Sequence, residues 1–139
     1  MDYHHYRTAL AETLAQSELP FPAAEYQVRL EKVRNAMTEH GLDALLLTDP
    51  ADINYLTGYH TFEVSVHACL VCTQEKLVLQ VASIETGAGV VTARVDEIIG
   101  YRWENLDEII TPLADLLSPC SKIGIDGWSS GLRFGVIDA

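Results

Sequence analysis

The chain has 139 residues, a length that fits one domain, and 48% of them are hydrophobic, which is enough for a folded core. It carries 20 acidic residues against 9 basic ones, and this net charge of −11 argues against binding to nucleic acid or to an anionic membrane surface. No apolar run reaches the length of a membrane span and the first residues show no secretory signal, so we expect a soluble, cytoplasmic protein.

Two helices are predicted before the first strand. Apolar residues repeat at helical spacing within residues 3–16, and Pro20 and Pro22 then prevent the helix from continuing. We therefore divide the chain into an N-terminal helical arm and linker, residues 1–20, and a domain, residues 21–139.

The second of these helices has the clearer pattern. It begins near Pro22, and Gly41 follows its end as a C-terminal cap. Its apolar stripe consists of Tyr26, Leu30, Val33 and Met37. The residues expected on its solvent side are Arg29, Lys32 and Glu39.

Strand and helix patterns alternate along the rest of the chain. Strands are predicted at residues 44–48, 64–72, 77–82, 97–101 and 122–126, and helices at residues 52–56, 83–93 and 106–117. This order predicts an α/β fold, with a mixed sheet flanked by helices on both faces. Residues 132–139 resemble the start of a further amphipathic helix, so we expect the chain to be part of a longer protein.

The segment 42–58 is the most informative stretch. A short apolar strand runs into Asp49-Pro50, a strong breaker, and Gly58 stops the helical turn that follows. The next loop thus lies beyond the carboxyl end of a strand, where open α/β sheets bind ligands.

That loop, residues 59–63, offers an imidazole, two aromatic rings and a carboxylate. Its candidate binding residues are Tyr59, His60 and Phe62. The alternative is a strand connection whose aromatic rings pack locally.

The sequence shows no catalytic or metal-binding constellation. Cys69 and Cys72 form a Cys-x-x-Cys, but Cys120 is the only other cysteine, whereas a zinc ribbon needs a second pair. Three positions apart on a strand, the two thiols point to opposite faces, which favours packing. The Gly-x-Ser-x-Gly pattern of a serine nucleophile is missing, and we expect Ser129 to cap a helix instead.

Several segments resemble the N-terminal domain of the creatinase and Xaa-Pro peptidase (prolidase) family. The most specific is residues 42–59, with Asp52-Ile53-Asn54-Tyr55-Leu56-Thr57-Gly58-Tyr59 at its end. The other matching features are Phe21, Glu25-Tyr26, Arg29-Leu30, Arg34 and Met37 in the helix before it, and the final strand Lys122–Asp126. By element order the resemblance covers residues 21–139.

The resemblance implies a mixed sheet with a ribonuclease H-like motif and, beyond Ala139, a catalytic C-terminal domain of pita-bread fold. That domain holds a pair of divalent metal ions in peptidase members, and it works without metal in creatinase-like ones. The full protein is expected to be a homodimeric hydrolase that cleaves a C–N bond. This chain would then supply dimer contacts and substrate access, with no catalytic residue, metal or cofactor of its own.

In dimeric members of the family, the loop after the glycine reaches toward the partner's active site, and this implies substrate contacts for Tyr59, His60 and Phe62. Creatinase-type sequences have an arginine in this loop, but here none lies between Gly58 and Cys72. Creatine is therefore disfavoured, and peptides, other amidines and ectoine-like amides stay open. The rival hypothesis is a stand-alone α/β binding or interaction module without catalysis.

Overall fold

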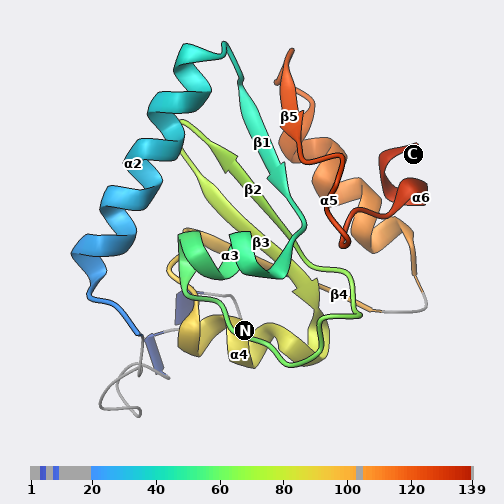
Figure 1. The fold of residues 1–139 in the computed structure, drawn as a ribbon. Coiled ribbons are helices and arrows are strands. Elements are labelled where there is room, and N and C mark those ends of the chain that lie inside the picture. The colour runs from blue at the N-terminus through green and yellow to red at the C-terminus, as the bar shows by residue number, and fades with distance from the viewer. Residues whose placement is uncertain (1–3, 6–7, 10–19, 103–104, 139) are drawn as a thin grey trace.

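A mixed β-sheet with helices on both faces forms the centre of the domain, as predicted (Figure 1). The structure is a computed structural model, and it describes residues 4–5, 8–9, 20–102 and 105–138. Most of the predicted N-terminal arm lies outside the described residues. In the described part of the chain the elements are α2 (Ala23–Glu39), β1 (Ala44–Leu47), α3 (Pro50–Thr57), β2 (Cys69–Thr73), β3 (Leu77–Ala82), a 3₁₀ turn (Ser83–Glu85), α4 (Thr86–Thr92), β4 (Glu97–Tyr101), α5 (Asp107–Leu117), β5 (Ile123–Ile125) and α6 (Phe134–Ile137).

Among the described residues, five strands form one sheet in the order β4-β3-β2-β1-β5. β2 pairs antiparallel with both β1 and β3, whereas β5 runs parallel to β1 and β4 runs parallel to β3. As a result β1, β3, β4 and β5 all end at the same edge of the sheet. Loops that follow these strands meet there, so this edge is where a ligand site is expected.

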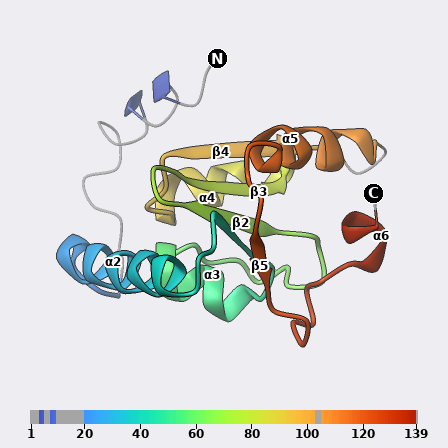
Figure 2. The ribbon, with the colours of Figure 1, turned by 90° about the horizontal axis from the view of Figure 1, so that it is seen from above.

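Each face of the sheet has its own hydrophobic core, because strand side chains alternate between the faces. Met37 of α2, Ile53 of α3 and Val90 of α4 belong to one core. Ile109 and Leu113 of α5 belong to the other. Figure 2 shows the sheet between α2 and α3 on one side and α5 on the other. The prediction of helices on both faces is confirmed.

The ends of α2 and α3 follow from a few residues. Gly41 has a φ of 63°, and the N–H groups of Gly41 and Leu42 return to the carbonyl groups of Thr38 and Met37, which is a Schellman cap. Asp49 caps α3 at its start, and Gly58, with a φ of 78°, ends it. Because glycine reaches positive φ without strain, these two positions set the path of the chain into β1 and into the loop after α3.

Arg29 corrects one prediction. The helix pattern placed it on the solvent side, but the residue is only 8% exposed. Its guanidinium lies 4.3 Å from the ring centroid of Phe21 and 4.4 Å from that of Tyr55, and it bonds Glu25 and the carbonyl oxygen of Tyr55. Aromatic faces and two acceptors make burial of this cation acceptable.

Two further predictions need correction. The strand expected over 64–72 starts only at Cys69, because residues before it turn away to line a cavity. Ser129 does not cap a helix, since α6 begins later, at Phe134. Its hydroxyl instead lies 2.9 Å from that of Thr48 and accepts the N–H of Gly131, which ties this C-terminal segment to the end of β1.

In the part of the chain that the structure describes, none of the helices combines the length and the apolar character needed to cross a bilayer.

Candidate functional site

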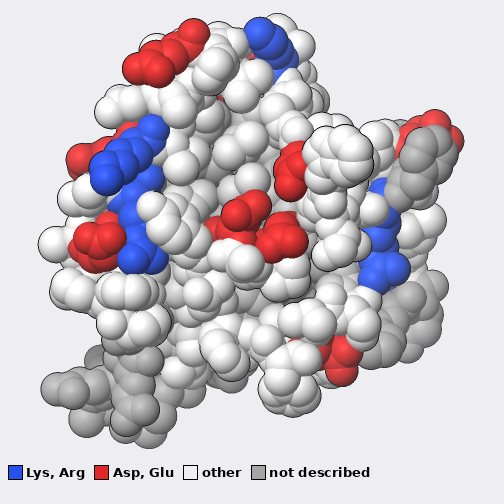
Figure 3. Space-filling model, in the orientation of Figure 1, with Lys and Arg blue, Asp and Glu red and all other residues white. Residues whose placement is uncertain are grey.

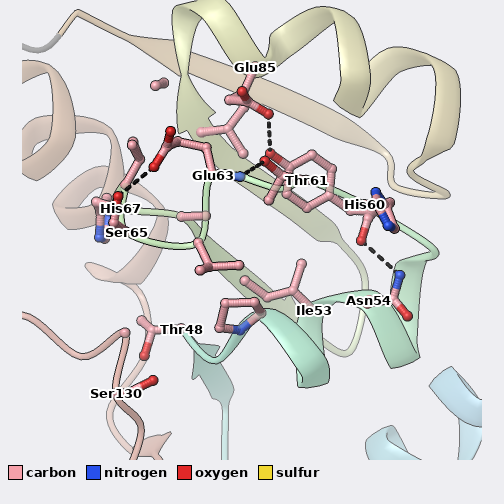
Figure 4. A pocket seen from close by; sticks show the side chains of 18 of the residues that line it. Thr48, Ile53, Asn54, His60, Thr61, Glu63, Ser65, His67, Glu85 and Ser130 are labelled. Atoms are coloured by element: carbon pink, nitrogen blue, oxygen red, sulfur yellow. Dashed lines mark hydrogen bonds between the residues drawn. The ribbon is translucent and has the colours of Figure 1, made fainter.

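A cavity of about 630 Å³ opens at the edge of the sheet where β1 and β3 end (Figure 4). α3 forms its floor, residues 59–68 form one wall, and residues 130–133 of the C-terminal segment form another. Residues 130–133 are far in sequence from α3 and from the loop that follows it. The strand order brings them together, because β5 lies beside β1 and delivers the chain to the same edge.

The loop after α3 is held in place by hydrogen bonds from α3 itself. The Asn54 side-chain amide donates to the carbonyl oxygen of Tyr59 at 3.0 Å, and the Thr57 hydroxyl accepts the N–H of Tyr59 at 2.9 Å. With Gly58 in the left-handed conformation, these bonds turn the chain sharply at the end of the helix. The loop is therefore positioned by groups within the segment that the sequence singled out.

The structure separates the three predicted binding residues. Tyr59 and His60 both line the cavity. Tyr59 is 4% exposed and donates its hydroxyl to Glu85 at 3.2 Å, and burial, followed by the negative charge of Glu85, raises the pKa of this phenol. His60 is exposed, and its backbone N–H donates to the Thr92 hydroxyl. Phe62 is 89% exposed and does not line the cavity.

Three ionisable side chains that the sequence did not single out also line the cavity: His67, Glu85 and Arg133. They come from the segment before β2, from the 3₁₀ turn after β3 and from the C-terminal segment. Arg133 donates Nη2 to the carbonyl oxygen of Ser65, so it joins the two walls. The sequence offered no local signal for this grouping, since it depends on strand order.

His67 belongs to a buried polar network beneath the cavity. It is 6% exposed, its Nε2 lies 3.3 Å from Oε1 of Gln80, and its carbonyl oxygen accepts the Tyr101 hydroxyl at 2.6 Å. The amide nitrogen of Gln80 donates in turn to the carbonyl oxygen of Ile109 at 3.0 Å. Burial is the main cause that lowers the pKa of His67, and the positive charge of Arg133 lowers it further.

Acidic residues gather near the end of β1. Burial raises the pKa of Asp52, and the charges of Asp49 and Asp126 raise it further. Figure 3 shows acidic side chains grouped near the centre of this face, with basic side chains toward its sides.

The two cysteines of the Cys-x-x-Cys point to opposite faces of β2, as predicted. Cys69 belongs to the core under α5 and Cys72 to the core on the other face, and both are free and fully buried. Burial raises the pKa of the Cys69 thiol to about 12, which makes it unreactive. Within the described ranges, no three His, Cys, Asp or Glu side chains are grouped to hold a metal ion.

The comparisons with known proteins agree with this architecture. An Xaa-Pro aminopeptidase from Streptococcus pyogenes superposes with a TM-score of 0.68 at 24% identity, covering 84% of this chain and 83% of that one. An ectoine hydrolase from Halomonas elongata is 42% identical over 57 residues, which are 41% of this chain and 14% of that protein. An uncharacterised hydrolase/peptidase from Sinorhizobium fredii is 38% identical over 87 residues, which are 60% of this chain and 22% of that protein.

The matches to these two curated relatives thus span less than a quarter of either protein. The family model of the creatinase/prolidase N-terminal domain matches residues 29–136, which include every strand described above. The chain therefore belongs to the creatinase/prolidase N-terminal domain family.

Proposed function

We propose that this chain is the non-catalytic N-terminal domain of a longer hydrolase that acts on C–N bonds. Two observations support this. The chain belongs to the creatinase/prolidase N-terminal domain family, and the two curated relatives, both named as hydrolases, are matched over only 14% and 22% of their lengths. Catalysis would belong to a C-terminal domain of the same protein, and a divalent metal pair, where the enzyme uses one, would be bound there. We assign no catalytic residue to this chain.

The proposed role of the domain is to shape substrate access and to contribute to a homodimer. The observation that carries this role is the cavity at the ends of β1 and β3, with the loop after Gly58 as its wall. Tyr59 and His60 lie on the cavity side of this loop, whereas Phe62 projects into solvent from the same loop. A solvent-exposed phenylalanine suits contact with another domain or subunit. We therefore keep Tyr59, His60 and Phe62 as the residues that contact or rim the substrate.

The partners of the domain would be its own catalytic domain and a second copy of the protein. The net charge of −11 disfavours nucleic acid and anionic membranes as partners, and we propose a cytoplasmic location. Among substrates, an Xaa-Pro peptide and an ectoine-like amide are the first to test, because the relatives are named for these activities.

The test compares this chain with the protein expressed from the complete reading frame. We expect the 139-residue chain to hydrolyse neither an Xaa-Pro dipeptide nor ectoine, and the complete protein to hydrolyse one of them. In the complete protein, Phe62→Ala and His60→Ala should raise KM several-fold with little change in kcat, since both residues would act in binding. Phe21→Ala is the matched control, because Phe21 is also an exposed phenylalanine but packs on Arg29.

Hydrolysis by the 139-residue chain alone would overturn the proposal. A complete protein that hydrolyses neither of these substrates nor another amidine or amide would favour the stand-alone binding module instead. A mass measurement in solution tests the homodimer separately.

A further inference from the structure

His67 presents an acceptor without a partner at the wall of the cavity. Of its two ring nitrogens, Nε2 faces Gln80, whereas Nδ1 is buried and forms no hydrogen bond. Buried polar atoms are nearly always paired, so an unpaired one in a cavity wall calls for an explanation.

The protonation of this ring follows from its neighbours. The amide nitrogen of Gln80 donates to the carbonyl oxygen of Ile109, so Oε1 of Gln80 must face His67 as an acceptor. His67 therefore carries its hydrogen on Nε2. Because burial and Arg133 lower its pKa, the ring is neutral at pH 7, and Nδ1 holds a lone pair. The missing partner is a hydrogen-bond donor.

The carboxylates of the cavity also have unused acceptor capacity. Glu85 accepts the Tyr59 hydroxyl on Oε2, and Glu63 accepts the Ser65 hydroxyl on Oε1. The second oxygen of each carboxylate has no hydrogen-bond donor among the described residues. Both side chains line the cavity, which suits a positively charged, N–H-bearing group.

Arg133 adds the opposite charge. It is exposed, lines the cavity and uses Nη2 to bond the carbonyl oxygen of Ser65, which leaves most of its five N–H groups for a ligand. A guanidinium is suited to a carboxylate. The loop after Gly58 contains no arginine, but the fold brings Arg133 to that loop from the C-terminal segment.

We propose that this cavity binds a small zwitterion, with its carboxylate on Arg133, an N–H group donating to Nδ1 of His67, and its cationic nitrogen on Glu63 and Glu85. Since Nδ1 is shielded from solvent, binding requires a side chain of the wall to move. The proposal rests on the cavity that carries the proposed function and names a ligand class for it. The site needs only residues of this chain, so a binding test on the 139-residue chain can fail independently of the hydrolysis test on the complete protein.

The first test is titration calorimetry on the 139-residue chain with glycylglycine, which carries all three groups. Glycylglycinamide lacks the carboxylate, and N-acetylglycine lacks the cationic nitrogen. We expect glycylglycine to bind and each analogue to bind about tenfold more weakly, because each leaves one charged wall group unpaired. Equal binding of all three compounds, or no binding of glycylglycine at millimolar concentration, would overturn the proposal.

Variants assign the contacts. Arg133→Gln should weaken glycylglycine about tenfold but leave glycylglycinamide unchanged, since that analogue has no carboxylate for Arg133. Lys122→Gln is the matched control: it removes one positive charge at the opposite end of β5 and should change neither affinity. Loss of affinity in both variants alike would mean that net charge, and not a site at Arg133, governs binding.

Imidazole ¹⁵N spectra of the unmodified chain test His67 without any substitution. Before ligand is added, the ring should show hydrogen on Nε2 and a lone pair on Nδ1. Glycylglycine should shift the Nδ1 resonance in the direction of an accepted hydrogen bond and leave Nε2 nearly unmoved. An Nδ1 chemical shift that does not change at saturating ligand, or a ring with hydrogen on Nδ1, would refute the assigned contact.

Discussion

Gly131 lies where the C-terminal segment passes the end of β1. A Cβ atom at this position would stand 2.0 Å from the carbonyl oxygen of Thr48, which is backbone and cannot swing away. Gly131→Ala should therefore destabilise the domain by roughly 1–3 kcal/mol and detach residues 130–133 from the cavity. Gly127→Ala is the control, because its Cβ would meet nothing within 4 Å. Urea unfolding measures the free energy of unfolding of both variants. Equal losses of stability would mean that the close approach of residue 131 to Thr48 is not the cause.

The buried His67 predicts a pH dependence of stability. Its pKa is lowered in the folded state, so the unfolded chain takes up a proton at higher pH than the folded chain does. The free energy of unfolding should therefore fall as the pH drops below about 6.5, with a slope of at most about 1.4 kcal/mol per pH unit. His67→Phe should lower stability at pH 7.5 but remove this slope between pH 7.5 and 5.5. Urea midpoints across that range provide the measurement, and an unchanged slope in the variant would contradict it.

The burial of single residues was the property that the sequence predicted least well. Arg29 occupies a solvent-side position of the helix pattern, and its burial depends in part on Phe21 and Tyr55, which lie outside α2. Likewise Tyr59 and Phe62 are similar in sequence context, yet one is buried and the other projects into solvent. These differences depend on contacts between elements, which periodicity does not reveal.

At the scale of elements, the two glycines of α4 make a matched pair. Gly87→Ala adds a methyl group with nothing within 4 Å, so it should stabilise the domain by about 0.5–1 kcal/mol through helix propensity. Gly89→Ala places its Cβ 3.0 Å from Cδ1 of Ile98, and this crowding should cancel the gain. Thermal unfolding compares the stability of the two variants. A stabilising effect of Gly89→Ala would show that the Ile98 side chain moves aside at little cost.

Elements with a strong local pattern were predictable from the sequence. β3 and β4 have the predicted bounds, and the breaker at Asp49-Pro50 and the stop at Gly58 bracket α3 as expected. The start of β2 was wrong because residues 64–68 also look apolar and strand-like, but they find their contacts in the cavity wall. The position of the cavity was predictable from the end of β1, whereas its far wall was not, because residues 130–133 arrive there through the pairing of β5 with β1.

At the scale of the whole molecule, opposing forces act on self-association. The net charge of −11 keeps copies apart at low ionic strength. Against this, β5 is an edge strand whose Ile123 and Ile125 are exposed, and they continue into an apolar groove with Val136 and Ile137. Exposed apolar edge strands favour pairing between chains. The salt concentration should therefore decide between monomer and associated chain, because salt screens the charge repulsion but not the apolar contact.

We expect the chain to be monomeric in low salt and to gain mass with concentration in about 0.5 M NaCl, where charges more than a few ångströms apart are screened. Ile125→Lys should keep it monomeric in both, because a lysine on an edge strand opposes pairing. Val28→Lys is the control: it makes the same change of charge at an exposed apolar residue of α2 and leaves β5 intact. Light scattering after size exclusion measures the mass. If both variants stay monomeric in high salt, general apolar exposure rather than the β5 edge drives association. If the unmodified chain is monomeric at both salt concentrations, any dimer contact lies outside this edge.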